Sequence, residues 1–316
     1  MAAGESVATK YSGRISSFGD SRPVAAECDL RDLEGERTAF QPFSDMPWPK
    51  VSLVIPTLNE ARNLPYVFSK LPPVLHEVII VDGHSVDDTV ATACRLRPDI
   101  RIIKQNRSGK GNALACGFAA ATGDIIAMVD ADGSADPAEI PQFVRALLDG
   151  ADFAKGTRFA DGGGSSDITR LRHLGNRTLS GLVNMLCRTK YSDLCYGYNV
   201  FWRRHVPVFG LQTESDIPAG SGTRLWGDGF EVETLINIRI AQAGLKVKEV
   251  ASYEHSRIHG VSNLNARRDG WRVLRTILAE RYYYHRRRKA QIKHASEALS
   301  PDRESAVTLE SVGRTS

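Results

Sequence analysis

The sequence predicts an α/β fold with a mostly parallel central sheet. Short runs of apolar, β-branched residues recur along the chain, and segments of helical character lie between them. Strands that alternate with helices at this spacing form right-handed crossovers, which place helices on both faces of a parallel sheet. Polar residues follow each apolar run, at the sheet edge where such folds bind ligands.

Four apolar runs begin the folded region. Each run is long enough for a strand and too short for a helix. The predicted strands cover residues 51–55, 78–81, 100–103 and 125–129. The helices expected between them cover residues of about 60–71, 87–96 and 110–121, and Asn59 is a candidate N-cap of the first helix.

Further elements are predicted in the second half of the chain. A short strand precedes Thr157, and a glycine-rich loop at 162–166 leads into a helix over 169–189. A helix follows Glu233, and another with helical apolar spacing starts near Trp271. The apolar spacing of the 169–189 helix predicts that five leucines face inward: Leu171, Leu174, Leu179, Leu182 and Leu186.

Length and composition predict one folded domain with irregular ends. The chain has 316 residues, of which 42% are apolar and 25% are charged, as in ordinary globular proteins. Residues 1–48 show no sustained periodicity and predict a disordered leader. The domain is expected over 49–280, with halves at 49–160 and 161–280, and 281–316 is expected to hold a basic helix end and a disordered tail.

Several classes of protein are disfavoured by the sequence. No apolar run approaches the roughly 18 residues that span a bilayer, and the N-terminus lacks an apolar signal segment, so a cytoplasmic location is expected. Five cysteines show neither C-x-x-C spacing nor a ligand-like spacing with histidine. This pattern argues against a zinc site and against a disulfide framework.

The polar residues at the strand ends are expected to meet in one crevice. Asp130 and Asp132 end the fourth predicted strand, and because strand side chains alternate, both point to the same face. Two carboxylates there indicate either a bound cation or a simple turn. The residues that follow the other three strands include Pro56, Asn59, Glu60, Asp82 and Lys110.

These segments together resemble the family 2 glycosyltransferases. The matching motifs are PTLNE at 56–60, VDGHSVDDT at 81–89, RSGKGNAL at 107–114, GDIIAMVDADGSADP at 123–137 and EHSRIHGVSNL at 254–264. The resemblance covers about residues 50–265 and is nearest to the dolichol- or polyprenol-phosphate mannose and glucose synthases. It implies a Rossmann-like, nucleotide-sugar-binding fold of the GT-A type, with the donor in the 49–160 half and the acceptor in the 161–280 half.

The resemblance implies that the strand ends bind a nucleotide diphosphate sugar, either a GDP- or a UDP-sugar. Asp130, Ala131 and Asp132 would lie at the donor diphosphate, where the two carboxylates would hold Mg²⁺ or Mn²⁺, the metals suited to oxygen ligands. Asp82 would accept hydrogen bonds from base or ribose, or else cap its own turn. The resemblance also implies that Pro56 and Asn59 belong to nucleotide-binding loops.

Two charged residues at predicted helix starts, Glu60 and Lys110, each have two possible roles. Glu60 resembles the family's nucleotide-contacting acid, although an acidic residue at a helix N-terminus is also favoured by the helix dipole. Lys110 stands between two glycines at a helix start, a setting that favours a bound anion. It contacts either a phosphate or base, or only solvent.

The residues expected to act in catalysis are Asp132, Asp228, Glu231 and Arg257. The resemblance implies inverting transfer by a hexosyltransferase, with Arg257 in the loop that closes over the diphosphate. A hydroxyl acceptor needs a base such as Asp228 or Glu231, whereas a phosphate monoester is already anionic at neutral pH. The motif has lysine where this chain has Asn263. A polyprenyl phosphate acceptor is preferred, and the alternatives are a hydroxyl of a soluble metabolite or glycan, or a non-catalytic nucleotide-sugar binder.

Positive charge gathers near the C-terminus. Residues 266–294 hold ten Lys or Arg against two acidic residues, a local charge of +8 in a chain of net charge +4. A basic amphipathic helix with aromatic residues can lie on an anionic membrane, which predicts peripheral contact at the inner membrane face. The alternative is a helix packed on the core with a solvated basic end. Nucleic-acid binding is not expected, because no recognition fold accompanies the charge.

Overall fold

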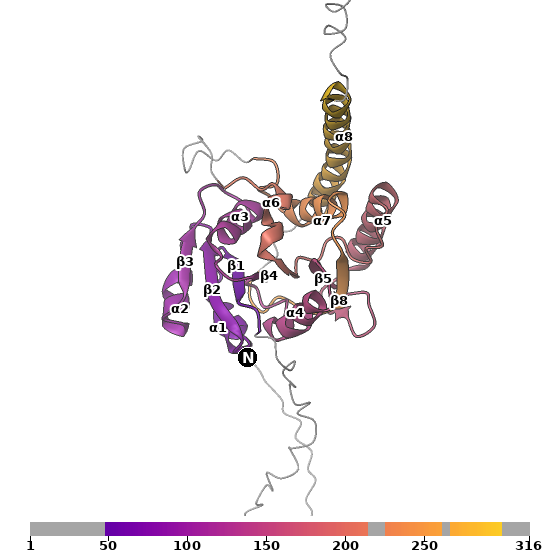
Figure 1. Cartoon of the computed structure of the whole chain (residues 1–316). Helices are drawn as coiled ribbons and strands as arrows, with labels where there is room; N and C mark the ends of the chain where they lie inside the picture. The colour runs from indigo at the N-terminus through magenta and orange to yellow at the C-terminus, as the bar shows by residue number, and fades with distance from the viewer. Residues whose placement is uncertain (1–47, 214–224, 261–265, 299–316) are drawn as a thin grey trace, which may run out of the picture. The chain divides into compact units, whose positions relative to one another are not determined.

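The computed structural model describes residues 48–213, 225–260 and 266–298 (Figure 1). The predicted leader, apart from Trp48, and the tail beyond residue 298 lie outside the described residues, so those expectations stay predictions. The predicted fold class is confirmed: a seven-stranded, mostly parallel sheet has the order β3-β2-β1-β4-β7-β5-β8. Its strands are β1 Val51–Thr57, β2 Leu75–Asp82, β3 Arg101–Lys104, β4 Ile125–Met128, β5 Phe153–Thr157, β7 Asn199–Trp202 and β8 Val247–Ala251.

One strand of the sheet runs against the others. β7 pairs antiparallel with both β4 and β5, and therefore joins the strands β1 to β4 to the second half of the sheet. β8 pairs parallel with β5 at the opposite edge from β3. A separate two-stranded sheet joins β6 (Gly164–Ser165) to β9 (Tyr253–Glu254).

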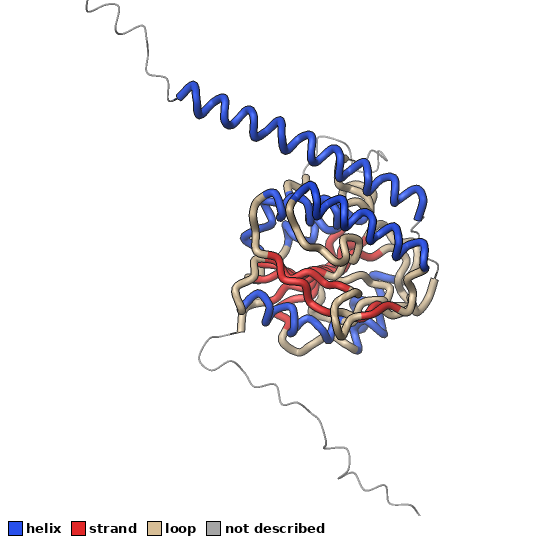
Figure 2. The backbone as a smooth tube through the Cα atoms, turned by 90° about the vertical axis from the view of Figure 1, so that its right-hand side faces the viewer, coloured by secondary structure: helices blue, strands red, loops and turns tan. Residues whose placement is uncertain are grey.

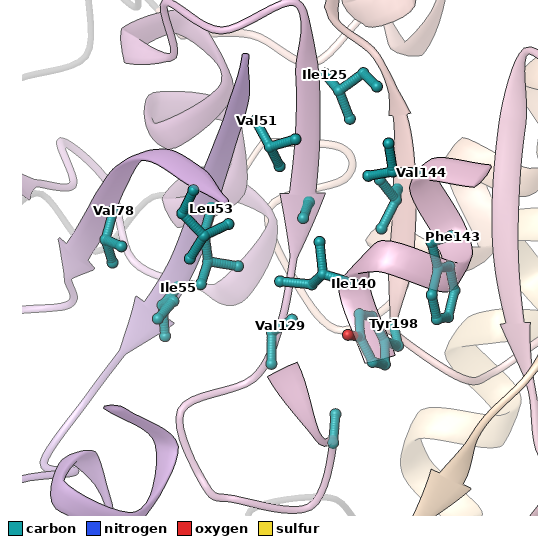
Figure 3. Packing of buried hydrophobic residues seen from close by; sticks show 14 of the residues in the cluster. Val51, Leu53, Ile55, Val78, Ile125, Val129, Ile140, Phe143, Val144 and Tyr198 are labelled. Atoms are coloured by element: carbon teal, nitrogen blue, oxygen red, sulfur yellow. The ribbon is translucent and has the colours of Figure 1, made fainter. Parts of the chain in front are cut away.

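Helices cover both faces of the sheet (Figure 2). α1, α2 and α4 lie on one face, and their apolar side chains pack on alternate residues of β1 such as Leu53 and Ile55. Figure 3 shows Ile140, Phe143 and Val144 of α4 in this core. α3, α6 and α7 pack on the other face, around Val54. The helices are α1 Leu64–Ser69, α2 Thr89–Leu96, α3 Lys110–Ala120, α4 Ile140–Leu148, α5 Arg170–Cys187, α6 Val206–Phe209, α7 Val232–Gln242 and α8 Ala266–Ala298.

The first helix begins later than predicted. α1 starts at Leu64, with Pro65 in its first turn, where a residue without an N–H is tolerated. Asn59 is not its cap: it has a φ of 58° and its Oδ1 accepts a hydrogen bond from Val86 N at 2.8 Å. Asn59 therefore joins the loop after β1 to the loop after β2.

The inward face of α5 also differs from the prediction. Leu171 and Leu174 are each 62% exposed, whereas Asn176, Ser180 and Val183 are buried. The expected leucine stripe is therefore wrong in the first turns of the helix. Leu179, Leu182 and Leu186 do pack, half-buried, against a small core shared by α5, α7 and α8.

α8 is the longest helix of the described chain. It packs on α5 and α7, where Val273 and Ile277 join their shared core. Among the described residues, no helix is both long and apolar enough to cross a membrane.

Candidate functional site

The predicted convergence of strand ends is confirmed by a large cavity. It has a volume of about 1090 Å³ and lies where β1, β2, β3 and β4 end. Pro56 after β1, Gly83 after β2, Gln105 after β3 and Asp130 after β4 all line it. The opposite wall comes from α5, from the first turns of α8 and from the loop before β7.

A partly buried ion cluster lines the cavity. Lys110 Nζ lies 2.7 Å from Asp130 Oδ1 and 2.6 Å from Glu233 Oε1. Burial lowers the pKa of Lys110, but the two carboxylates outweigh this effect and hold the pKa above its ordinary value. A Cβ added at Gly197 would stand 3.2 Å from both Lys110 Nζ and Glu233 Oε1. The cluster is therefore a fixed cation between two carboxylates, covered by a residue without a side chain.

Two glycines place Lys110 in this cluster. A Cβ at Gly109 would lie 2.0 Å from the carbonyl oxygen of Asp228, and one at Gly111 would lie 1.7 Å from that of Gly227. Any larger residue would push the start of α3 away from the 227–228 turn. The glycines of the RSGKGNAL motif thus allow the close backbone approach that brings α3 and α7 together.

A second cation bridges two further carboxylates. Arg257 Nη1 lies 3.0 Å from Glu60 Oε1, and its Nη2 lies 3.0 Å from Asp132 Oδ2. Ser134 holds the other oxygen of Asp132 through its backbone N–H at 3.0 Å and its hydroxyl at 2.6 Å. Burial raises the pKa of Glu60 above its ordinary value, although Asn63 and Arg257 oppose that shift. Asn263, further along the same loop, lies outside the described residues.

The carboxylates at the end of β4 suit a hard divalent cation. Asp130 and Asp132 offer only oxygen ligands, and each already faces a positive side chain, Lys110 or Arg257. Within the described ranges, no group of three or more His, Cys, Asp or Glu side chains is arranged to hold a metal. The two aspartates would therefore share a metal with oxygens of the ligand.

Most of the residues predicted for the donor site line the cavity. Seven do so: Pro56, Glu60, Lys110, Asp130, Ala131, Asp132 and Arg257. Two do not: Asn59 joins two loops, and Asp82 accepts hydrogen bonds from Ser85 N at 3.2 and 3.3 Å. Asp82 therefore caps its own turn in the structure, and its contact with a base or ribose stays a prediction.

The structure does not bring Asp228 and Glu231 to the cavity. Asp228 forms a two-pronged ion pair with Arg107, at 2.9 Å for each oxygen, and both side chains are buried. Glu231 accepts a hydrogen bond from Gly229 N at 3.2 Å and faces Arg272 at 3.7 Å. The acidic residue of this segment that lines the cavity is Glu233.

Sequence reasoning missed Glu233 as a site residue. It stands one position inside α7, two residues after Glu231, so on a helix the two side chains point in different directions. Lys110, at the start of α3, could have pointed to Glu233, because a lysine removed from solvent needs an acidic partner.

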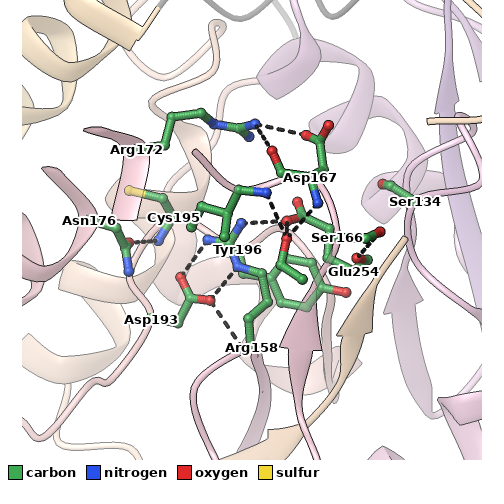
Figure 4. A network of polar contacts seen from close by, with 12 residues as sticks. Ser134, Arg158, Ser166, Asp167, Arg172, Asn176, Asp193, Cys195, Tyr196 and Glu254 are labelled. Atoms are coloured by element: carbon green, nitrogen blue, oxygen red, sulfur yellow. Dashed lines mark hydrogen bonds and ion pairs between the residues drawn. The ribbon is translucent and has the colours of Figure 1, made fainter. Parts of the chain in front are cut away.

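A second network, also missed, lies beside the cavity (Figure 4). Arg158, just after β5, forms paired hydrogen bonds to Asp193 at 2.7 and 2.9 Å and contacts Glu254 at 2.9 Å. Burial lowers the pKa of Arg158, but Asp193 and Glu254 outweigh this effect and raise it. The guanidinium also lies 5.0 Å from the ring centre of Tyr196. This network fixes the loop before β7 against β5 and β9.

Comparison with known sequences places this architecture in a family. The profile of glycosyl transferase family 2 matches residues 52–207. An uncharacterized glycosyltransferase of Mycobacterium tuberculosis is 39% identical over 108 residues, which are 34% of this chain and 48% of that protein. A dolichol-phosphate mannosyltransferase of Pyrococcus furiosus is 36% identical over 36% of this chain and 34% of its own. The matched segment therefore spans 48% of the length of the first relative and 34% of the length of the second.

Two longer matches agree with this placement. Glycosyltransferase AglJ of Haloferax volcanii is 29% identical over 71% of this chain and 70% of its own length. The crystal structure of glucosyl-3-phosphoglycerate synthase from Mycobacterium tuberculosis with Mn²⁺, UDP-glucose and phosphoglyceric acid shares the fold, with a TM-score of 0.56 and 22% identity over 74% of this chain and 80% of that one. The profile and these relatives show a glycosyl transferase family 2 domain over residues 52–207, and the solved structure shares the fold.

Proposed function

We propose that the protein transfers a sugar, in a metal-dependent and inverting reaction, from a nucleotide diphosphate sugar to an acceptor. The observation that carries this proposal is the pair Asp130 and Asp132 at the end of β4, which faces Lys110 and Arg257 in one cavity. Such a site offers both the carboxylates that hold a cation and the cations that hold a diphosphate.

The residues of the cavity divide into two roles toward the donor. Asp130 and Asp132 would hold Mg²⁺ or Mn²⁺, which when bound supplies Lewis-acid stabilisation of the leaving diphosphate. Arg257 and Lys110 would add positive charge at the diphosphate oxygens. Glu60, which positions Arg257 at 3.0 Å, keeps that guanidinium over the site. Relatives of known structure bind Mn²⁺ with UDP-glucose, which supports a sugar nucleotide with a divalent metal.

The acceptor oxygen would attack the anomeric carbon as the bond to the nucleoside diphosphate breaks. The electron pair of that bond leaves with the diphosphate, and the configuration at the carbon inverts. A polyprenyl phosphate would bring an oxygen that is already anionic, so no protein base is required. The matching segment of a dolichol-phosphate mannosyltransferase supports this acceptor class.

A hydroxyl acceptor is the second candidate. Glu233 lines the cavity beside Asp130 and could take a proton from an attacking hydroxyl. The fold neighbour glucosyl-3-phosphoglycerate synthase was crystallised with a soluble acceptor, phosphoglyceric acid. An assay with both acceptor types therefore decides between the candidates.

The proposal is tested with a panel of GDP- and UDP-sugars, with Mg²⁺ or Mn²⁺, with and without polyprenyl phosphate. We expect one donor to be turned over only with metal, and turnover to rise with the lipid. Asp132→Asn should lower the metal-dependent rate by about 10²-fold or more, because a ligand to the metal is lost. Asp149→Asn, the same change at an exposed position after α4, is the control. Full metal-dependent activity of Asp132→Asn would contradict the metal assignment.

A further inference from the structure

Asn63 is a buried amide that joins two loops far apart in the sequence. It is 3% exposed and directly precedes α1. Its Oδ1 accepts a hydrogen bond from His259 N at 3.0 Å, and its Nδ2 donates one to His259 O at 3.1 Å. One side chain therefore holds both backbone polar groups of a residue that lies 196 positions later.

The backbone of Asn63 is itself held by the first turn of α1. Its N–H donates to Glu60 O at 2.9 Å, and its carbonyl oxygen accepts from Tyr66 N at 3.0 Å and from Val67 N at 3.2 Å. The ring of Tyr66 meets that of His259 edge to face, with 5.6 Å between the ring centres. Asn63 is thus a fixed point, to which the loop around His259 is attached.

The loop around His259 carries Arg257. This loop follows β9, and the two residues after Arg257 are both anchored. Ile258 N donates to Asp132 O, in the turn after β4, at 3.3 Å. His259 is held by Asn63, in the segment between β1 and α1. Arg257 therefore stands on a short piece of backbone that two different loops hold in place.

Asn63 also contacts the side chain that positions Arg257. Its Nδ2 donates a second hydrogen bond to Glu60 Oε2, while Glu60 Oε1 accepts from Arg257 Nη1 at 3.0 Å. An amide offers two N–H donors and one oxygen, and here both donors and the oxygen are used. A carboxylate in the same place would lack both donors and would repel Glu60.

Arg257 depends on such contacts, because its side chain is long and 23% exposed. Arginine side chains have many rotamers, so neighbouring groups must fix the guanidinium in one place. Its carboxylate partners are Glu60 and Asp132, and Asp132 is also proposed to hold the metal. Glu60 and the anchored backbone are then the contacts that can keep Arg257 in place when Asp132 binds a metal.

We propose that Asn63 is a positioning residue, which sets Arg257 over the leaving diphosphate by holding Glu60 and the backbone of His259. Glu60 and Arg257 line the cavity and Asn63 does not, so Asn63 acts through them. The inference rests on the proposed function, since that function places Arg257 at the diphosphate of the donor.

Asn63→Asp tests this role in a double-mutant cycle with Arg257→Gln. The aspartate keeps an oxygen for His259 N, but it removes both donors and adds a charge beside Glu60. UDP and GDP are titrated with Mn²⁺ into the full-length wild type by calorimetry, and the tighter of the two is used for the variants. We expect Asn63→Asp to weaken binding about fivefold or more and Arg257→Gln about tenfold or more. In the Arg257→Gln background, Asn63→Asp should change the affinity less than about twofold, because its effect passes through Arg257.

Asn184 provides a matched control. Its side chain holds the backbone of Tyr191 in the same way, with Oδ1 2.8 Å from Tyr191 N and Nδ2 2.8 Å from Tyr191 O, and it does not line the cavity. Asn184→Asp should lower the midpoint of urea unfolding and leave nucleotide affinity within about twofold of the wild type. Asn63→Ala, which removes the contacts without adding a charge, repeats the cycle, and urea unfolding checks that each variant is folded.

The outcomes separate this inference from the proposed function. Equal losses from Asn63→Asp in the wild-type and Arg257→Gln backgrounds would overturn the inference and leave the proposed function standing. So would a folded Asn63→Asp or Asn63→Ala protein with wild-type nucleotide affinity. A wild type that binds neither UDP nor GDP with metal would overturn both. A loss that appears only when Arg257 is present, with wild-type affinity in Asn184→Asp, would support the inference.

Discussion

Glu233 and Asp228 are buried, ion-paired acidic residues five positions apart that differ in their access to the cavity. Glu233 lines the cavity and contacts Lys110 at 2.6 Å, whereas Asp228 is buried against Arg107. A residue that lines the cavity can reach the acceptor and act on its proton, whereas Asp228 does not line the cavity. The two carboxylates should therefore fail in different ways when each is made neutral.

Glu233→Gln reports on the acceptor class. With a phosphate acceptor, turnover should stay within about tenfold of the wild type, because no base is needed. With a hydroxyl acceptor, loss of the base should lower kcat by roughly 10²- to 10⁴-fold. Steady-state rates with each acceptor, at saturating donor, give the answer. Glu231→Gln is the neighbouring control, since that side chain faces Arg272 instead of the cavity.

Asp228→Asn should lower the free energy of unfolding and leave kcat nearly unchanged. It leaves the Arg107 guanidinium buried without a countercharge, which costs about 3 to 5 kcal/mol of the free energy of unfolding. Urea unfolding should show this loss, while kcat per folded molecule stays within about threefold of the wild type at low temperature. A stable Asp228→Asn protein with a large loss of kcat would show that this acid serves the reaction directly.

The residues of the site could be predicted from sequence only in part. Spacing at strand ends located Asp130 and Asp132, because alternation and chain direction are local properties. It could not show whether Asp82 only caps its own turn or also binds a ligand. The pairing of Arg107 with Asp228 joins residues 121 positions apart, so no local pattern contains it.

At the scale of elements, Glu77 of β2 joins several parts of the sheet. It accepts hydrogen bonds from Ser52 Oγ of β1 at 2.6 Å and from Thr122 N, before β4, at 2.7 Å, and it pairs with Arg101 of β3. Burial raises its pKa, but these donors outweigh burial and lower the pKa to about 2. The unfolded chain, with a pKa near 4.5, thus binds a proton more readily than the folded protein does.

The sign of this shift predicts how stability depends on pH. The contribution of Glu77 is complete above pH 4.5 and is lost as pH falls toward 2. After solvent screening it amounts to about 2 kcal/mol, so Glu77→Gln should be less stable than the wild type by that amount at pH 7. Urea unfolding at pH 7 and at pH 3 should show the gap narrowing in acid. A gap of equal size at both pH values would assign the loss to packing instead of charge.

Elements with local signals were predicted well, and those that depend on packing were not. The β-branched runs of β1, β2 and β4 located the parallel strands to within a few residues. The antiparallel β7 was not foreseen, because its place between β4 and β5 depends on a long connection. The predicted buried face of α5 was wrong in its first turns, because the residues buried there include the polar Asn176 and Ser180. Apolar spacing gives no guide to polar positions.

For the whole molecule, the exposed face of α8 predicts contact with a membrane. α8 leaves three large apolar or aromatic side chains exposed: Trp271 at 71%, Leu278 at 55% and Tyr282 at 59%. Residues 281–316 contain eight Lys or Arg and four Asp or Glu. Aromatic and basic residues on one exposed helix are typical of proteins that lie on anionic lipid. An acceptor with a prenyl chain would require the cavity to open near such a surface.

Deletion of residues 281–316 should weaken binding to vesicles that contain anionic lipid by about tenfold or more, because each basic residue near the surface contributes about 1 kcal/mol. The cut leaves Glu280 in place, so its contacts with Arg239 at 2.9 Å and Trp226 at 2.9 Å are kept and the fold of α7 and α8 should survive. Wild-type binding should weaken as salt rises, since the attraction is screened. A full-length variant with glutamine at 286–289 separates charge from length. Equal sedimentation of all three proteins with anionic vesicles would assign the basic end of α8 to solvent and leave the lipid acceptor to be reached from solution.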